Sequence, residues 1–160
     1  MNKILWKPEK SFIESSEMMK FIHFVNKKEN TSFNSYDHIY NWSIKHAAKF
    51  WSHFSDFSEI IFHKPHTEIV DDINKMPGAT WFKNSELNFA ENLLKRRDTK
   101  NAIITIDENN NPKFISYKDL FEQVSKIAHF LKTLGVEKND RVVAFMPNIA
   151  ETVIAMLATS

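Results

Sequence analysis

Two residue types are scarce or missing in this sequence, and each absence excludes a class of chemistry. The 160 residues contain no cysteine, which excludes disulfides, iron–sulfur clusters, thiolate zinc sites and a cysteine nucleophile. Only two glycines occur, Gly78 and Gly135. A phosphate-cradling loop needs several glycines close together, because only glycine lets the backbone approach a phosphate at positive φ. The sequence therefore predicts that this chain does not hold ATP in the usual way by itself.

Strong charge and long apolar runs are also lacking. The formal net charge is +1 and the isoelectric point is near 7.9, so we expect neither a nucleic-acid nor a membrane partner. No run approaches the roughly 18 apolar residues of a membrane helix. The first six residues form a poor signal peptide, because no long apolar run follows Lys3. These features and the absence of cysteine fit a cytoplasmic protein.

Aromatic residues are abundant, with fourteen Phe and four Trp, and they concentrate in the first part of the chain. Met18, Phe21, Ile22 and Val25 follow helical spacing, and Phe50, Phe54 and Phe57 form a stripe beside Trp51. The expected elements are helices over about 15–28, 35–44, 46–57 and 87–94, a short strand or helix end at 60–62, and an ordered loop over 65–83.

The second part of the chain has a different character. Two strands over 102–106 and 113–117 flank a predicted hairpin turn at 107–112. A long helix follows, with Ser116 and Asp119 at its start and Gly135 as its stop. An apolar strand over 141–146 then precedes a last helix, for which Asn148 and Glu151 form an expected capping pair. One strongly buried strand does not complete a sheet, so the sequence predicts a fragment of a larger α/β domain.

Several motifs of this sequence resemble the N-terminal part of acetoacetyl-CoA synthetases, within the adenylate-forming superfamily. The most specific is Trp81-Phe82 followed by Leu87-Asn-Phe-Ala-Glu-Asn-Leu-Leu94, within the segment Met76–Leu94. The others are Leu5-Trp-Lys-Pro8, Trp42-Ser43 with Phe50-Trp51, Leu134-Gly-Val136, Asp140-Arg-Val142 and Pro147–Thr159. Two positions depart from the family pattern: Ala150 replaces a common proline and Asn139 replaces a common glycine. Asn tolerates left-handed geometry fairly well, so neither departure affects the expected fold.

The resemblance implies a fold and a reaction. The fold is α/β: a helical N-terminal extension over 1–97, similar to the acetyl-CoA synthetase N-terminal region, then the incomplete start of the AMP-binding domain over 98–160. The reaction implied for the full-length enzyme converts acetoacetate, ATP and CoA into acetoacetyl-CoA, AMP and pyrophosphate, with Mg²⁺ and basic groups balancing the phosphate charge.

The family's functional motifs lie beyond residue 160. We therefore expect no catalytic, cofactor-binding or metal-binding residue here, no activity of the chain alone, and the remainder of the domain as its partner. The alternatives are a fragment of an acetate or propionate ligase, or a non-catalytic stand-alone module. Continuation of the reading frame into a phosphate loop would favour the enzyme.

Polar residues of the Leu87–Leu94 motif allow a structural and a catalytic interpretation. We expect Trp81, Phe82 and the Leu87–Leu94 segment to anchor the N-terminal region on the large domain by packing, with Asn88, Glu91 and Asn92 hydrogen-bonding neighbouring backbone. A catalytic Glu91 is disfavoured, because the sequence shows no paired acid or base.

The remaining candidates have a structural interpretation as well. His63, His66, Glu68, Asp71 and Asp72 resemble a metal cluster, but Pro65 argues against the helix that would align the two rings, so a solvated loop is expected. His46 and His53 are two helical turns apart, too far for one ion, and His129 is expected to be exposed. Asn148 stands where ligands bind open α/β sheets, yet helix capping explains it as well. The Phe50–Phe57 stripe is expected to be core.

Overall fold

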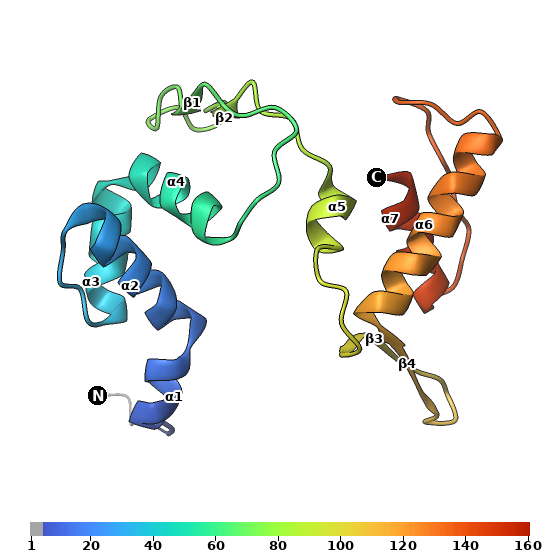
Figure 1. The fold of residues 1–160 in the computed structure, drawn as a ribbon, viewed down its shortest axis with the longest axis horizontal. Helices are drawn as coiled ribbons and strands as arrows, with labels where there is room; N and C mark the ends of the chain where they lie inside the picture. Colours follow the sequence, from blue (N-terminus) through green and yellow to red (C-terminus); the bar gives the residue numbers. More distant parts are fainter. Residues whose placement is uncertain (1–4) are drawn as a thin grey trace. The chain divides into compact units, whose positions relative to one another are not determined.

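The computed structural model describes residues 5–160, which divide into two compact units. Unit 1 comprises the chain up to Ile60 together with Lys64–Ser85, and unit 2 comprises Ile61–His63 together with Glu86–Ser160. Figure 1 shows the elements of both units in chain order. Residues 1–4, the start of the segment judged a poor signal peptide, lie outside the described residues. Among the residues from 5 onward, we find no helix with the length and apolar character of a membrane span.

Unit 1 begins with helices, and the three predicted from sequence are confirmed. The helices are α1 (Lys10–Ser15), α2 (Glu17–Glu29), α3 (Tyr36–Lys45) and α4 (Ala47–Phe57). Ser16 and Ser35 cap α2 and α3 by accepting the backbone N–H groups of Met19 and His38. Asn30 ends α2 in the left-handed conformation, with φ of 55°.

The core of unit 1 is aromatic, as the composition indicated. Its buried residues are Phe21, Ile22, Val25, Ile39 and Trp42. The ring of Phe21 meets Phe50, Phe54 and Phe57 edge-on, at centroid distances of 5.2–5.7 Å. The predicted stripe is only partly core, because Phe50 and Phe57 pack on the buried cluster while Phe54 and Trp51 remain 41% exposed.

A short antiparallel hairpin occupies the stretch predicted to be a loop. Its strands are β1 (Glu68–Val70) and β2 (Trp81–Lys83), with Val70 opposite Trp81. The prediction was wrong because strands of three residues are too short to show an alternating pattern. Trp81 contacts Trp51 of α4 at 6.1 Å between ring centroids, so the hairpin packs on the helices of the same unit.

Unit 2 combines one hairpin with three helices around a second core. The hairpin strands β3 (Asn101–Ile106) and β4 (Pro112–Ser116) are antiparallel, as predicted. The helices are α5 (Phe89–Leu93), α6 (Tyr117–Thr133) and α7 (Ala150–Thr159), and α6 packs against α7 (Figure 1). The buried cluster joins all three helices: Ala90, Leu94, Leu120, Val124, Ile154 and Leu157.

The predicted ends of α6 are confirmed. Ser116 Oγ accepts the Asp119 N–H at 3.0 Å and donates to the Asp119 carboxylate at 2.6 Å. At the other end, Gly135 has φ of 83° and its N–H donates to the Lys132 carbonyl at 3.0 Å. Asn139 adopts φ of 81°, in agreement with its predicted tolerance of left-handed geometry.

Two predictions near the end of the chain are wrong. The segment 141–146 is not a strand, and Val143 and Phe145 are 90% and 105% exposed. Strands need a neighbour, and each sheet of the described residues has only two strands, which pair with each other. Helix α7 starts after Ile149 without a side-chain cap, so Asn148 and Glu151 do not form the expected capping pair.

Candidate functional site

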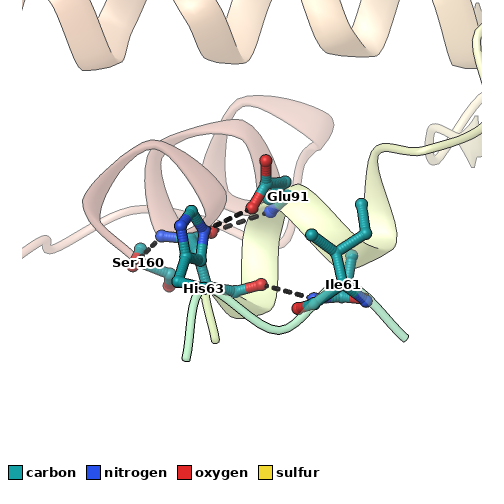
Figure 2. Close-up of polar contacts among 6 residues, drawn as sticks. Ile61, His63, Glu91 and Ser160 are labelled. Carbon is teal, nitrogen blue, oxygen red and sulfur yellow. Dashed lines mark hydrogen bonds and ion pairs between the residues drawn. The ribbon is translucent and has the colours of Figure 1, made fainter. Parts of the chain in front are cut away.

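Polar side chains with defined partners gather around α5 in unit 2. We name this group the α5 junction: Ile61, His63, Asn88, Glu91, Asn92 and Ser160 (Figure 2). Five of its members come from two short stretches that lie far apart in the sequence. The junction contains the three polar residues of the Leu87–Leu94 motif.

Helix α5 forms because its first turn is capped and its apolar face is buried. Asn88 lies in the extended conformation at the N-cap, and its Oδ1 accepts the Glu91 N–H at 2.8 Å. Ala90 and Leu94 are 6% and 5% exposed in the core of unit 2. Asn88, Glu91 and Asn92 are spaced by three and four positions, so one face of the helix presents all three.

Asn92 binds the backbone of Ile61 on both sides. Its Oδ1 accepts the Ile61 N–H at 2.9 Å, and its Nδ2 donates to the Ile61 carbonyl at 3.1 Å. The same Nδ2 also donates to the Asn88 carbonyl at 3.0 Å. A side-chain amide thus supplies the paired hydrogen bonds that a neighbouring strand would supply.

Three further contacts involve residues of the junction. His63 Nε2 and Glu91 Oε2 lie 2.6 Å apart, and the His63 N–H donates to the Glu86 carbonyl at 2.7 Å. Asn88 Nδ2 donates to the carbonyl of Ser160 at 2.9 Å. The prediction that Asn88 and Asn92 bind neighbouring backbone is therefore confirmed, whereas Glu91 binds a side chain.

The structure corrects one premise about Glu91. The sequence showed no paired acid or base, but His63, 28 positions away, forms such a pair with Glu91. The two side chains are 57% and 42% exposed, so water screens their interaction. Sequence reasoning missed the partner because the interpretation of His63 concerned a metal ion. The geometry of the junction favours holding chain segments together over acid–base catalysis.

The metal-cluster interpretation finds no support in the structure. Residues 5–160 contain no group of three or more His, Asp or Glu side chains placed to hold an ion. Asp71 instead closes the β1–β2 hairpin: its carboxylate accepts the N–H groups of Asp72 and Thr80 at 2.7 and 2.8 Å, and Lys75 Nζ at 2.8 Å. The Lys75 ammonium and these two N–H groups hold the pKa of Asp71 far below its usual range.

A charged cluster in unit 1 was not predicted from sequence. Glu29 of α2 binds Lys49 at 2.6 Å and His53 at 2.7 Å, both on α4. These hydrogen bonds lower the pKa of Glu29. The His53 ring stacks on Trp42 at 6.1 Å, and its Nδ1 is buried without a hydrogen-bond partner. Partners 20 and 24 positions apart leave no periodic signal, so only the fold reveals them.

The other predicted candidates are His46, His129 and Asn148. His46 and His129 are exposed. Asn148 lines a hollow of about 230 Å³ together with Ile149, Ala150, Val153 and residues 103–106.

We tested whether the residues present fit a nucleotide phosphate. Gly78 and Gly135 have φ of 111° and 83°, which suits turns. A Cβ added at either glycine would meet no protein atom within 4 Å, and the two glycines lie in different units, so they do not line one common loop. Among residues 5–160, the glycines therefore build no phosphate cradle.

Comparison with known proteins places these two units in a wider context. A family model described as AMP-binding enzyme matches residues 90–160, and one described as acetyl-coenzyme A synthetase N-terminus matches residues 36–93. The chain is 34% identical to malonamoyl-CoA synthetase of Penicillium aethiopicum, with 99% of the chain and 22% of that protein covered. It is 33% identical to acetoacetyl-coenzyme A synthetase of Rhizobium meliloti (strain 1021), with 98% and 24% covered.

A solved structure agrees with the sequence comparison. Acetoacetyl-CoA synthetase from Streptomyces lividans superimposes with a TM-score of 0.86 at 30% identity, and the match covers 99% of this chain and 25% of that one. The chain thus spans about a quarter of the length of these relatives. The predicted fold class is confirmed: the helices and small strands match the N-terminal portion of that solved structure.

Proposed function

We propose that this chain is part of an ATP-dependent acid–thiol ligase, because it belongs to the AMP-binding enzyme family. Within that family it corresponds to the N-terminal portion of the acetoacetyl-CoA synthetase-like members. The observation that carries the proposal is the match to a solved acetoacetyl-CoA synthetase over 99% of the chain. We propose residues 1–97 as its N-terminal region and 98–160 as the start of the AMP-binding domain. The absence of cysteine supports a cytoplasmic location.

The proposed reaction has two steps. A carboxylate oxygen of the acid attacks the α-phosphorus of ATP, so that a P–O bond forms and pyrophosphate leaves. The sulfur of CoA then attacks the acyl carbon, a C–S bond forms, and AMP leaves with the former carboxylate oxygen. Mg²⁺ would balance charge on the phosphates in the first step. Activation is needed because a free carboxylate is a poor acyl donor.

We propose acetoacetate as the acid. Two relatives are named for acetoacetyl-CoA and malonamoyl-CoA, and the acyl groups of both compounds have a second carbonyl at the 3-position. This shared feature supports a 3-carbonyl acid over plain acetate or propionate. Malonamate is therefore the most informative competing substrate.

The role of this chain in the reaction is to scaffold the enzyme. Residues 5–160 offer no phosphate cradle of glycines and no group of three metal-ligating side chains. What they do offer is a helical unit, a second unit with its own core, and a network of hydrogen bonds at α5. The 160-residue chain alone should therefore release no pyrophosphate in the presence of acetoacetate, ATP and CoA.

A graft tests the proposal. Residues 1–160 replace the matching quarter of the Streptomyces lividans enzyme, and acetoacetate-dependent pyrophosphate release is compared with that of the unmodified enzyme and of the isolated chain. We expect activity in the graft and none in the isolated chain. A folded graft without activity would contradict the proposal, as would release by the isolated chain, which would instead place catalytic residues within it.

A further inference from the structure

The chain crosses between the two units more often than a simple tether requires. It leaves unit 1 after Ile60, spends residues 61–63 in unit 2, and returns to unit 1 for residues 64–85. It then enters unit 2 for good at Glu86. Three crossings therefore connect the units. Two of the three exist only because residues 61–63 stay on unit 2.

Two of the three side chains in residues 61–63 are exposed, while Phe62 is half-buried. The three residues lie outside any helix or strand, Ile61 is 37% exposed and His63 is exposed. The hydrogen-bond partners of Ile61 and His63 all belong to the second stretch of unit 2: Asn92 on the backbone of Ile61, the Glu86 carbonyl on the His63 N–H, and Glu91 on the His63 ring. Figure 2 shows Ile61 and His63 beside α5, with His63 next to Glu91. Hydrogen bonds to the backbone of Ile61 and to His63 thus contribute to the attachment of this segment, beside the half-buried Phe62.

We propose that the α5 junction is a clasp, in which Asn92 and Glu91 fix the crossing segment 61–63 to unit 2. The clasp turns residues 64–85 into a closed loop, whose two ends meet where the His63 N–H donates to the Glu86 carbonyl at 2.7 Å. That loop carries the β1–β2 hairpin, which packs on α4 of unit 1. With the clasp closed, three crossings connect the units. With it open, only the crossing at residues 85 and 86 remains.

The two halves of the clasp differ in strength. Asn92 is half-buried and makes two bonds to one residue, so opening this half releases both backbone groups of Ile61 at once. The Glu91–His63 pair is exposed, and exposed ion pairs are weak. The Asn92 half therefore contributes most to holding residues 61–63 on unit 2. The two family matches meet at residues 90–93, within α5, which places the clasp where the two sequence modules join. This inference does not depend on the proposed reaction.

Amide hydrogen exchange of the whole chain tests the clasp residue by residue. In Asn92→Leu we expect the amides of Ile61 and His63 to exchange about tenfold faster or more. The reason is that residues 61–63 can then open without breaking the two hydrogen bonds between Asn92 and the backbone of Ile61. Asn92→Asp keeps an acceptor for the Ile61 N–H but loses the donors, so its effect should be intermediate. Glu91→Gln should have the smallest effect.

Two controls keep the test decisive. Asn34→Asp makes the same amide-to-acid change at an exposed position before α3 and should leave Ile61 unchanged. Amides of Leu120 and Val124 in α6 report on the core of unit 2. Faster exchange confined to residues 61–63 supports the clasp. Unchanged exchange at Ile61 in Asn92→Leu overturns it, and so does an equal increase throughout α6, because Asn92 would then hold the fold of the unit and not the segment.

Discussion

Glu29 allows a sharp test of how burial governs the value of an ion pair. Its carboxylate is 17% exposed and binds Lys49 and the 15% exposed His53, at 2.6 and 2.7 Å. Glu17 forms a pair with Lys20 at the same 2.6 Å, but these side chains are 76% and 59% exposed. Glu29→Gln and Glu17→Gln therefore make the same change at the same distance. They differ in the exposure of the carboxylate and in the second partner of Glu29, His53, whereas Lys49 and Lys20 are similarly exposed, at 58% and 59%.

The expected costs follow from that difference. Exposed pairs contribute about 0–1 kcal/mol, whereas breaking a fully buried pair costs about 3–5 kcal/mol. Glu29 lies between these limits, and Gln retains hydrogen-bonding capacity, so we expect Glu29→Gln to lower the free energy of unfolding by about 1–2 kcal/mol. Glu17→Gln should change it by less than about 0.5 kcal/mol.

Urea unfolding followed by tryptophan fluorescence measures this locally, because all four tryptophans lie in unit 1. The pKa of Glu29 is lowered in the folded chain by Lys49 and His53. Its stabilising effect is thus fully present above the unfolded pKa of glutamate, about 4.3, and is lost as pH falls through the lower folded pKa. The difference between wild type and Glu29→Gln should shrink in that acid range. Equal costs for the two variants, or a difference that grows in acid, would contradict a larger contribution from the less exposed Glu29.

Three further predictions concern single contacts. Ser116→Ala should destabilise α6 by about 1 kcal/mol, because it removes the N-cap, whereas Ser125→Ala in the middle of the same helix should be nearly neutral. Urea unfolding followed by circular dichroism measures both costs, and equal costs would contradict the capping role of Ser116. Asp71→Asn should speed hydrogen exchange of the Thr80 amide, because it weakens the hydrogen bond that the carboxylate accepts from that amide. In the wild type, protection of the Thr80 amide should persist until pH falls well below about 3.9, because the pKa of Asp71 is lowered on folding. Loss of this protection at a higher pH would contradict the role of Asp71. The isolated chain should self-associate through its exposed apolar residues, and Phe145→Lys should reduce this in sedimentation velocity, while a monomeric wild type would count against it.

Local signals made much of the fold predictable. The helices of unit 1 have regular apolar spacing and Ser caps, and α6 has Ser116, Asp119 and Gly135 at its ends, so each boundary is encoded by adjacent residues. The β3–β4 hairpin was predictable because a polar turn separates two apolar runs. These elements depend on interactions within a few positions.

The errors occurred where the determining contacts are distant in sequence. Strands β1 and β2 are brief, and Asp71 joins them through Thr80, nine positions away. The apolar pattern at 141–146 predicts a strand, but none of the described strands pairs with it. In the α5 junction, the polar residues of the motif were recognised, while their partners Ile61, His63 and Ser160 were not. Periodicity carries no information about such long-range partners.

Purifying the native polypeptide that contains this sequence tests whether the chain is part of an acid–thiol ligase. We propose to capture it with an antibody against unit 1 and to measure pyrophosphate release with ATP and CoA, in the presence of acetoacetate, malonamate or acetate. We expect a polypeptide roughly four times the 18.8 kDa of this chain, with pyrophosphate release that depends on acetoacetate. A full-length polypeptide of that size without acid-dependent release, or a native product of 18.8 kDa, would contradict the assignment as part of an acid–thiol ligase.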